Sequence, residues 1–161
     1  MKTNKIFSLK NNTFIFYQER IFTNLGLTFL NRVSQSILCN LQDADLSGAN
    51  LINVKLVGAS LIGANLSQVN LSLANLSQAN LTGANLSKAN LSLVNFTDAD
   101  LTRANLSNVE LRGAILDRVN LTGANLTGVN LTGVNLTGAK LCGTLMPDGN
   151  ISSEGCMAID N

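Results

Sequence analysis

The sequence predicts an all-β solenoid, in which the chain winds into a stack of four-sided coils with a separate segment at each end. A leucine stands at every fifth position from Leu41 to Leu141, with Phe96 as the one replacement. The residue two positions before each of these centres is Ala or Val, with Cys39 as the exception. Aromatic residues make up only 4% of the chain, so the expected core consists of small aliphatic side chains. Internal repetition of this kind is the signature of a repeat architecture.

A period of five fits neither regular backbone. In an α-helix five residues turn by about 140°, so the leucines would spiral around the helix. In a flat strand five is an odd number, so successive leucines would point to opposite faces. A corner of about 90° after each five-residue unit points every leucine at one axis. Four units then close one coil, and the coils stack about 4.8 Å apart through backbone hydrogen bonds.

Residues twenty apart should therefore lie above one another. The small inward position is not uniform, because Val69, Val109 and Val129 fall on one side whereas another side carries only Ala. The 21 units of residues 39–143 make about five coils with a height of about 25 Å.

The unit A(N/D)L(S/T)X, as in ANLSQANLTGANLSKANLS at residues 74–92, resembles the pentapeptide-repeat family. The resemblance covers residues 39–143 and implies a right-handed quadrilateral β-helix. The uninterrupted register and the C-terminal LCGTLMPDG make the chain most similar to cyanobacterial members, including a thylakoid-lumen type. The family's members imply a structural or protein-interaction role, or inhibition of DNA gyrase by an acidic rod that mimics DNA, with quinolone protection.

Residues 1–38 allow two interpretations. Lys2 and Lys5, the apolar stretches that follow and the small residues near position 36 suit a targeting peptide, although Glu19 and Arg20 interrupt it. A cleaved signal over residues 1–36 would send the protein to a thylakoid lumen or periplasm; without cleavage it would be cytoplasmic. Apolar residues between positions 22 and 38 alternatively suit an amphipathic helix that caps the first coil. No window of 18 apolar residues exists, so no membrane span is expected.

Two further features concern the ends of the stack. Ile52, Val57 and Ile62 replace the usual Ser or Thr on three consecutive sides, and the N-terminal cap is expected to cover this patch. Residues 144–161 form the expected C-terminal cap, which begins with a turn at the PDG sequence. Cys142 and Cys156 form a disulfide that pins this cap, or remain two thiols.

The residue types argue against catalysis. The chain has no His, so neither the commonest general base nor the commonest metal ligand is present, and no Gly-rich phosphate loop occurs. We expect no enzyme activity, cofactor or metal. Residues 1–38 carry five basic and one acidic group, residues 39–143 carry six of each sign, and residues 144–161 carry three acidic groups. The balanced repeat block argues against DNA mimicry and against nucleic-acid binding.

Outward charges are expected to pair. Asp98 and Arg118 are twenty apart, and Glu110 and Arg112 flank one leucine. Such exposed pairs contribute little to stability.

Leu73 and Leu93 break the polar pattern outside the stack. They are twenty apart and should form one strip with Ile52 below them. An exposed aliphatic strip indicates a protein partner or a homodimer contact, or else leucines that the surface tolerates.

Overall fold

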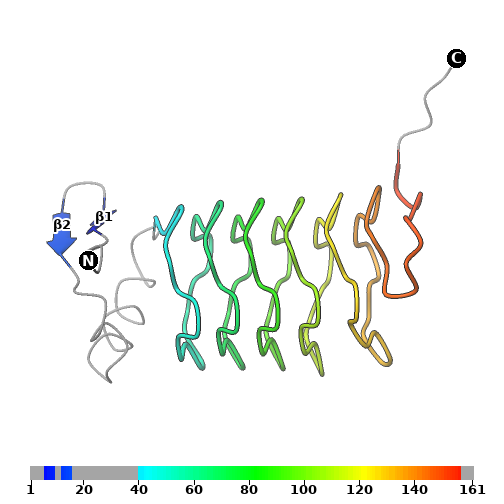
Figure 1. Cartoon of the computed structure of the whole chain (residues 1–161), viewed down its shortest axis with the longest axis horizontal. Coiled ribbons are helices and arrows are strands. Elements are labelled where there is room, and N and C mark those ends of the chain that lie inside the picture. The colour runs from blue at the N-terminus through cyan, green and yellow to red at the C-terminus, as the bar shows by residue number, and fades with distance from the viewer. Residues whose placement is uncertain (1–5, 10–11, 16–39, 157–161) are drawn as a thin grey trace, which may run out of the picture.

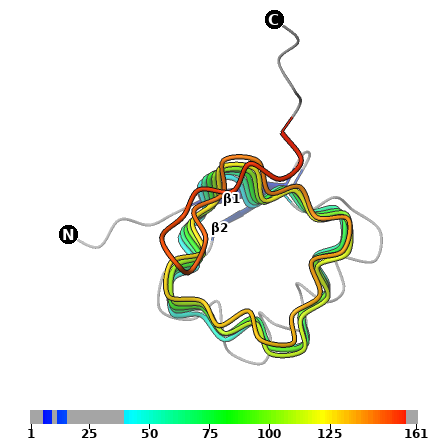
Figure 2. The ribbon, with the colours of Figure 1, turned by 90° about the vertical axis from the view of Figure 1, so that its right-hand side faces the viewer.

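A computed structural model describes residues 6–9, 12–15 and 40–156 of the chain. Residues 40–156 form a rod of stacked coils (Figure 1), and seen along the rod each coil has a four-sided outline (Figure 2). Parallel bridges join residues twenty apart, from Asn40 with Ser60 to Asn125 with Leu145. Each coil therefore takes twenty residues, and residues 41–140 make five coils.

Most sides of the coils use the same set of hydrogen bonds. The N–H of an inward leucine donates to the next coil, as from Leu51 to the carbonyl of Asn70 (2.7 Å). The N–H two residues later does the same, as from Asn53 to Ser72 (2.8 Å), and a tight turn then closes, as from Val54 N–H to the Leu51 carbonyl (3.3 Å). The turn supplies the corner that the five-residue period requires.

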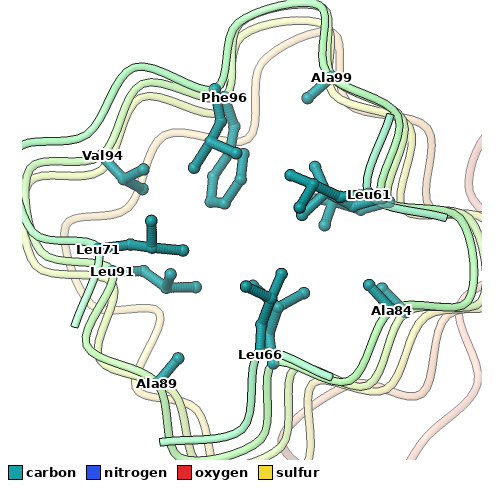
Figure 3. Close-up of a cluster of buried hydrophobic side chains, with 14 of the residues drawn as sticks. Leu61, Leu66, Leu71, Ala84, Ala89, Leu91, Val94, Phe96 and Ala99 are labelled. Atoms are coloured by element: carbon teal, nitrogen blue, oxygen red, sulfur yellow. The ribbon is translucent and has the colours of Figure 1, made fainter. Parts of the chain in front are cut away.

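The leucine centres fill the axis of the rod. From Leu51 to Leu101 every centre is at most 1% exposed, and Figure 3 shows Phe96 pointing into the same core as the neighbouring leucines. Burying each such side chain contributes about 1.5–3 kcal/mol. At the C-terminal end Leu131 and Leu136 are only partly buried. The core is thus tightest in the middle coils.

The chain leaves the coil register at Met146 and turns back on itself. Gly149 N–H donates to the Met146 carbonyl (3.0 Å), and Leu145 pairs antiparallel with Ile151. A disulfide joins Cys142 to Cys156, with a Cα–Cα distance of 4.7 Å. The returning strand is therefore fixed to the side of the last coil.

Two short strands are described near the N-terminus. Strand β1 (Ile6–Leu9) pairs antiparallel with β2 (Asn12–Ile15), and Ile6 lies opposite Ile15. This hairpin was not predicted, because the apolar residues there were assigned to a targeting peptide or cap. The helix expected between residues 22 and 38 lies outside the described residues, as does Cys39.

Candidate interaction surfaces

The corner position, two residues after each inward leucine, has a left-handed backbone. Glycines there have φ between 65° and 74° from Gly48 to Gly143, and eleven other residues hold φ between 54° and 62°. This conformation is open to glycine and costs other residues about 1–2 kcal/mol. A bulky aliphatic residue at a corner is therefore unfavourable unless it gains something in return.

Leu73 and Leu93 occupy two corners of one column, with φ of 62° and 59°. Each is 54% exposed, so neither recovers the backbone cost through burial. Leu93 lies over Gly113, where an added Cβ would meet Leu93 Cδ2 at 2.8 Å. Ile52, the third member of the expected strip, is half-buried. We call Leu73 and Leu93 the leucine strip.

The expected cap-covered patch is less exposed than the leucine strip. Val57 is 39% exposed, whereas Ile52 and Ile62 are half-buried. The expected cover is the N-terminal cap of residues 1–38, most of which lies outside the described residues, so this patch stays a prediction. Sequence reasoning missed Ile115, which is 45% exposed, and Ile151, which is 72% exposed.

The outer faces satisfy their own polar groups. The Oδ1 atom of each ladder asparagine accepts the N–H two residues later, as from Thr97 to Asn95 (2.9 Å). One column also links side chains between coils, where Asn65 donates to Asp45 (3.1 Å) and Asn105 donates to Asn85 (3.2 Å). Among the described residues no buried side-chain polar atom lacks a partner. The Oδ1 atoms of the ladder asparagines are therefore already engaged within the rod.

The two expected charge pairs differ. Arg118 binds Asp98 through two hydrogen bonds, Nε to Oδ1 at 2.6 Å and Nη2 to Oδ2 at 2.8 Å. The hydrogen bonds from Arg118 lower the pKa of Asp98 and raise that of Arg118. The expected pairing of Glu110 with Arg112 was wrong, because in residues 40–156 no hydrogen bond or ion pair joins them. Both side chains are exposed.

One break in the ladder lies beside these charges. Of the sides centred on Leu41 to Leu126, each is hydrogen-bonded to the next coil except those centred on Leu111 and Leu116, which face residues 130–137. Figure 1 shows the last coil (orange) standing away from the previous one along its lower edge. A cavity of about 650 Å³ lies there, lined by residues 108–113 and by Gly128, Asn130, Thr132 and Gly133. We call this feature the ladder opening.

The ladder opening was missed at the sequence level. Glu110 and Ile115 take the place of the usual ladder asparagine, and Arg112 and Asp117 take the place of Ser or Thr. Four such departures also occur at Lys55, Val57, Ser60 and Ile62, where the ladder is closed, so the departures alone do not predict an opening.

Two classes of site receive no support from the described residues. No group of three or more Cys, Asp or Glu side chains there could hold a metal ion. No helix in the same part of the chain is long and apolar enough to cross a bilayer.

The repeat geometry agrees with the comparison against protein families. The signature of pentapeptide repeats matches residues 39–78, 79–118 and 104–143. The chain therefore belongs to the pentapeptide-repeat family. Its structural neighbours are right-handed quadrilateral β-helices, the class that the resemblance implied.

Solved structures of several members are similar to this chain. A pentapeptide repeat protein from Nostoc PCC 7120 is 30% identical, with a TM-score of 0.58, over 76% of this chain and 98% of that one. One from the thylakoid lumen of Arabidopsis thaliana is 36% identical, with a TM-score of 0.47, over 58% of this chain and 61% of its own length. The fluoroquinolone resistance protein QnrB1 is 18% identical, with a TM-score of 0.31, over 73% of this chain and 74% of that one. No curated protein matches the chain.

Proposed function

We propose that the chain is a non-enzymatic protein-interaction module and that its partner binds the face carrying the leucine strip. The observation that carries this proposal is the pair Leu73 and Leu93, which are 54% exposed at left-handed corners. Both positions combine a backbone cost with an exposed aliphatic side chain, and contact with an apolar partner surface offsets both.

The rest of this face is a regular surface whose asparagines bond to their own backbone, and it acts as a rigid scaffold for the leucine strip. The ladder asparagines are bonded to their own backbone, so specificity falls to the residues that interrupt the pattern. Ser72 and Ser92 lie beside the leucines, and Ser92 is 7% exposed. An apolar contact bordered by small polar groups suits a protein partner or a second copy of the chain.

DNA mimicry is the weaker candidate. A DNA mimic needs a strongly negative surface. Residues 39–143 carry six acidic and six basic groups, and Asp98 is neutralised by Arg118. A supercoiling assay with DNA gyrase tests this candidate, and inhibition near equimolar protein would reverse the ranking.

The leading proposal is tested by replacing both leucines with aspartate. Leu73→Asp/Leu93→Asp places two charges on the strip, and we expect partner capture from the native compartment to fall at least tenfold. The matched control is Gln68→Asp/Gln78→Asp, which adds the same charge at exposed left-handed corners (φ 58° and 60°) of other columns. Equal capture by both double variants contradicts the proposal.

The same variants distinguish a homodimer from a different partner. Sedimentation of the purified protein over a range of concentrations reports self-association directly. If the chain pairs through the strip, the leucine double variant is monomeric and the glutamine double variant is not.

A further inference from the structure

The ladder opening lies beside an unusual pair of residues in the core. Val109 and Val129 are twenty apart, and every other stacked pair at the small inward position of residues 39–143 contains at least one Ala or Cys. Two β-branched side chains at the coil spacing of about 4.8 Å have little room to adjust. Overpacking in a core can force backbone shifts. This pair is therefore the expected cause of the opening.

The two rims of the ladder opening carry unused backbone groups. On the lower rim, within residues 40–156, the N–H groups of Leu111 and Gly113 and the carbonyl of Val109 have no hydrogen-bond partner. On the upper rim, again within residues 40–156, the N–H and carbonyl of Asn130 and the carbonyl of Thr132 also have no hydrogen-bond partner. An extended polypeptide presents alternating donors and acceptors along both edges, so it can satisfy both rims at once.

The side chains at the rims indicate which segment fits. Glu110 and Arg112 are exposed, lie on the same outer surface and form no ion pair with any described residue. Outward residues of an inserted strand are also spaced by two. Opposite charges directly across a strand pair are favourable. Gly113 and Gly133 also line the opening and add no side chains of their own to it.

We propose that the ladder opening binds an extended segment of a partner protein by strand addition between two coils. The segment carries a basic residue facing Glu110 and an acidic residue, two positions away, facing Arg112. This inference rests on the proposed function only in treating the chain as a protein-binding module. The site is separate from the leucine strip, although Leu93 packs over Gly113 and one partner can reach both.

The first test asks whether the opening exists in solution. Hydrogen exchange in the full chain should be fast at the amides of Leu111 and Gly113 and slow at those of Leu91 and Leu93, which donate to the next coil at 2.9 Å. Equal protection of the two pairs would overturn the proposal.

The second test uses the synthetic peptide Ac-Val-Lys-Val-Glu-Val-NH₂ as the probe. We expect saturable amide shifts confined to residues 109–118 and 130–137 of the full chain. The same peptide N-methylated at its valines lacks the donors of one edge and should give no shifts. Equal shifts from both peptides, or none from either, overturn strand addition.

A closing variant provides the third test. Val129→Ala removes the stacked valine pair and should close the opening, slow exchange at Leu111 at least tenfold and abolish peptide binding. Val109→Ala removes the same valine pair from the other coil. It is the variant to use if Val129→Ala fails to fold. The control Val69→Ala lies in the same column between two alanines and should leave binding unchanged. Unchanged binding in both closing variants contradicts the inference.

The peptide test separates this inference from the function proposed above. Leu73→Asp/Leu93→Asp leaves the rims intact and should retain the peptide-induced shifts. If the leucine strip proves not to be an interface, strand addition at the ladder opening is unaffected. If strand addition fails, the leucine strip is likewise unaffected.

Discussion

Two positions of each five-residue unit, the corner and the small inward site, restrict which residue types the rod accepts. At the corner the backbone is left-handed, so Leu73 and Leu93 carry a conformational cost that a glycine avoids. At the inward site Val109 stacks on Val129, the one valine–valine pair of residues 39–143, and the ladder opens beside this pair. The leucine centres vary least, because any polar atom there would be buried without a partner.

Replacing the strip leucines by asparagine should separate folding from binding. Asparagine tolerates the left-handed corner better than leucine does. We expect Leu73→Asn/Leu93→Asn to keep or raise the melting temperature while partner capture falls. Thermal unfolding followed by circular dichroism measures the first quantity. A clear drop in melting temperature would mean that the leucines serve the fold.

The pair of Asp98 and Arg118 makes stability depend on pH in acid. Hydrogen bonds from Arg118 lower the pKa of Asp98 in the folded chain. The contribution of the pair is therefore complete above the unfolded pKa of aspartate, about 3.9, and is lost as the pH falls through the lower folded value.

We expect Arg118→Gln to raise the pKa of Asp98 toward its ordinary value in a carboxyl NMR titration. The stability difference between the two proteins should shrink below about pH 4. An unchanged pKa of Asp98 in the variant would show that the two hydrogen bonds are absent in solution.

Among the elements, the returning strand at the C-terminus is held by three kinds of contact. Ser152 N–H donates to the Thr144 carbonyl (2.8 Å), and the disulfide joins Cys142 to Cys156. Thr144 is fully buried, and its Oγ1 donates to the Leu121 carbonyl at 2.6 Å. The returning strand is therefore fixed to the last side of the rod, and Thr144 ties that side to the coil beneath it.

Breaking the disulfide should loosen this element. The bridge closes a loop of 14 residues in sequence, for which the chain-entropy treatment gives a stabilisation of about 3 kcal/mol. Cys156→Ser should lower the midpoint of denaturant unfolding accordingly. Reductant should lower the midpoint of the natural protein and leave that of Cys156→Ser unchanged. A reductant effect of equal size on both proteins contradicts the assignment.

At the scale of the whole molecule, the rod is a stack in which each coil contacts only its neighbours. Because the repeat length of a coil is twenty residues, removing one whole coil keeps every remaining residue in its column. Removing nineteen residues instead moves every later leucine by one position, so that these leucines no longer point at the axis.

We expect deletion of residues 61–80 to give a folded, shorter rod and deletion of residues 61–79 to unfold the C-terminal coils. Circular dichroism and amide dispersion in NMR spectra distinguish the two outcomes. Equal folding of both deletions would contradict a twenty-residue coil as the unit of stability.

The regular parts of the rod could be predicted, because one residue type recurs at one spacing and a single backbone satisfies it. The coil length, the buried leucine centres and the Asp98–Arg118 pair follow from that spacing. The ladder opening could not be predicted from pattern alone. Its expected cause is how the side chains of Val109 and Val129 pack against each other, and a five-residue pattern does not encode such packing. The hairpin of β1 and β2 has no counterpart in the repeat from which to infer it.

The ladder opening also has a mechanical consequence. Interlayer hydrogen bonds run along the rod, so a force pulling its two ends apart loads every coil-to-coil seam in series. The seam between residues 109–118 and 130–137 lacks these bonds on two adjacent sides and is therefore the weakest link. Under tension the rod is expected to part there first, while the disulfide keeps residues 142–156 closed.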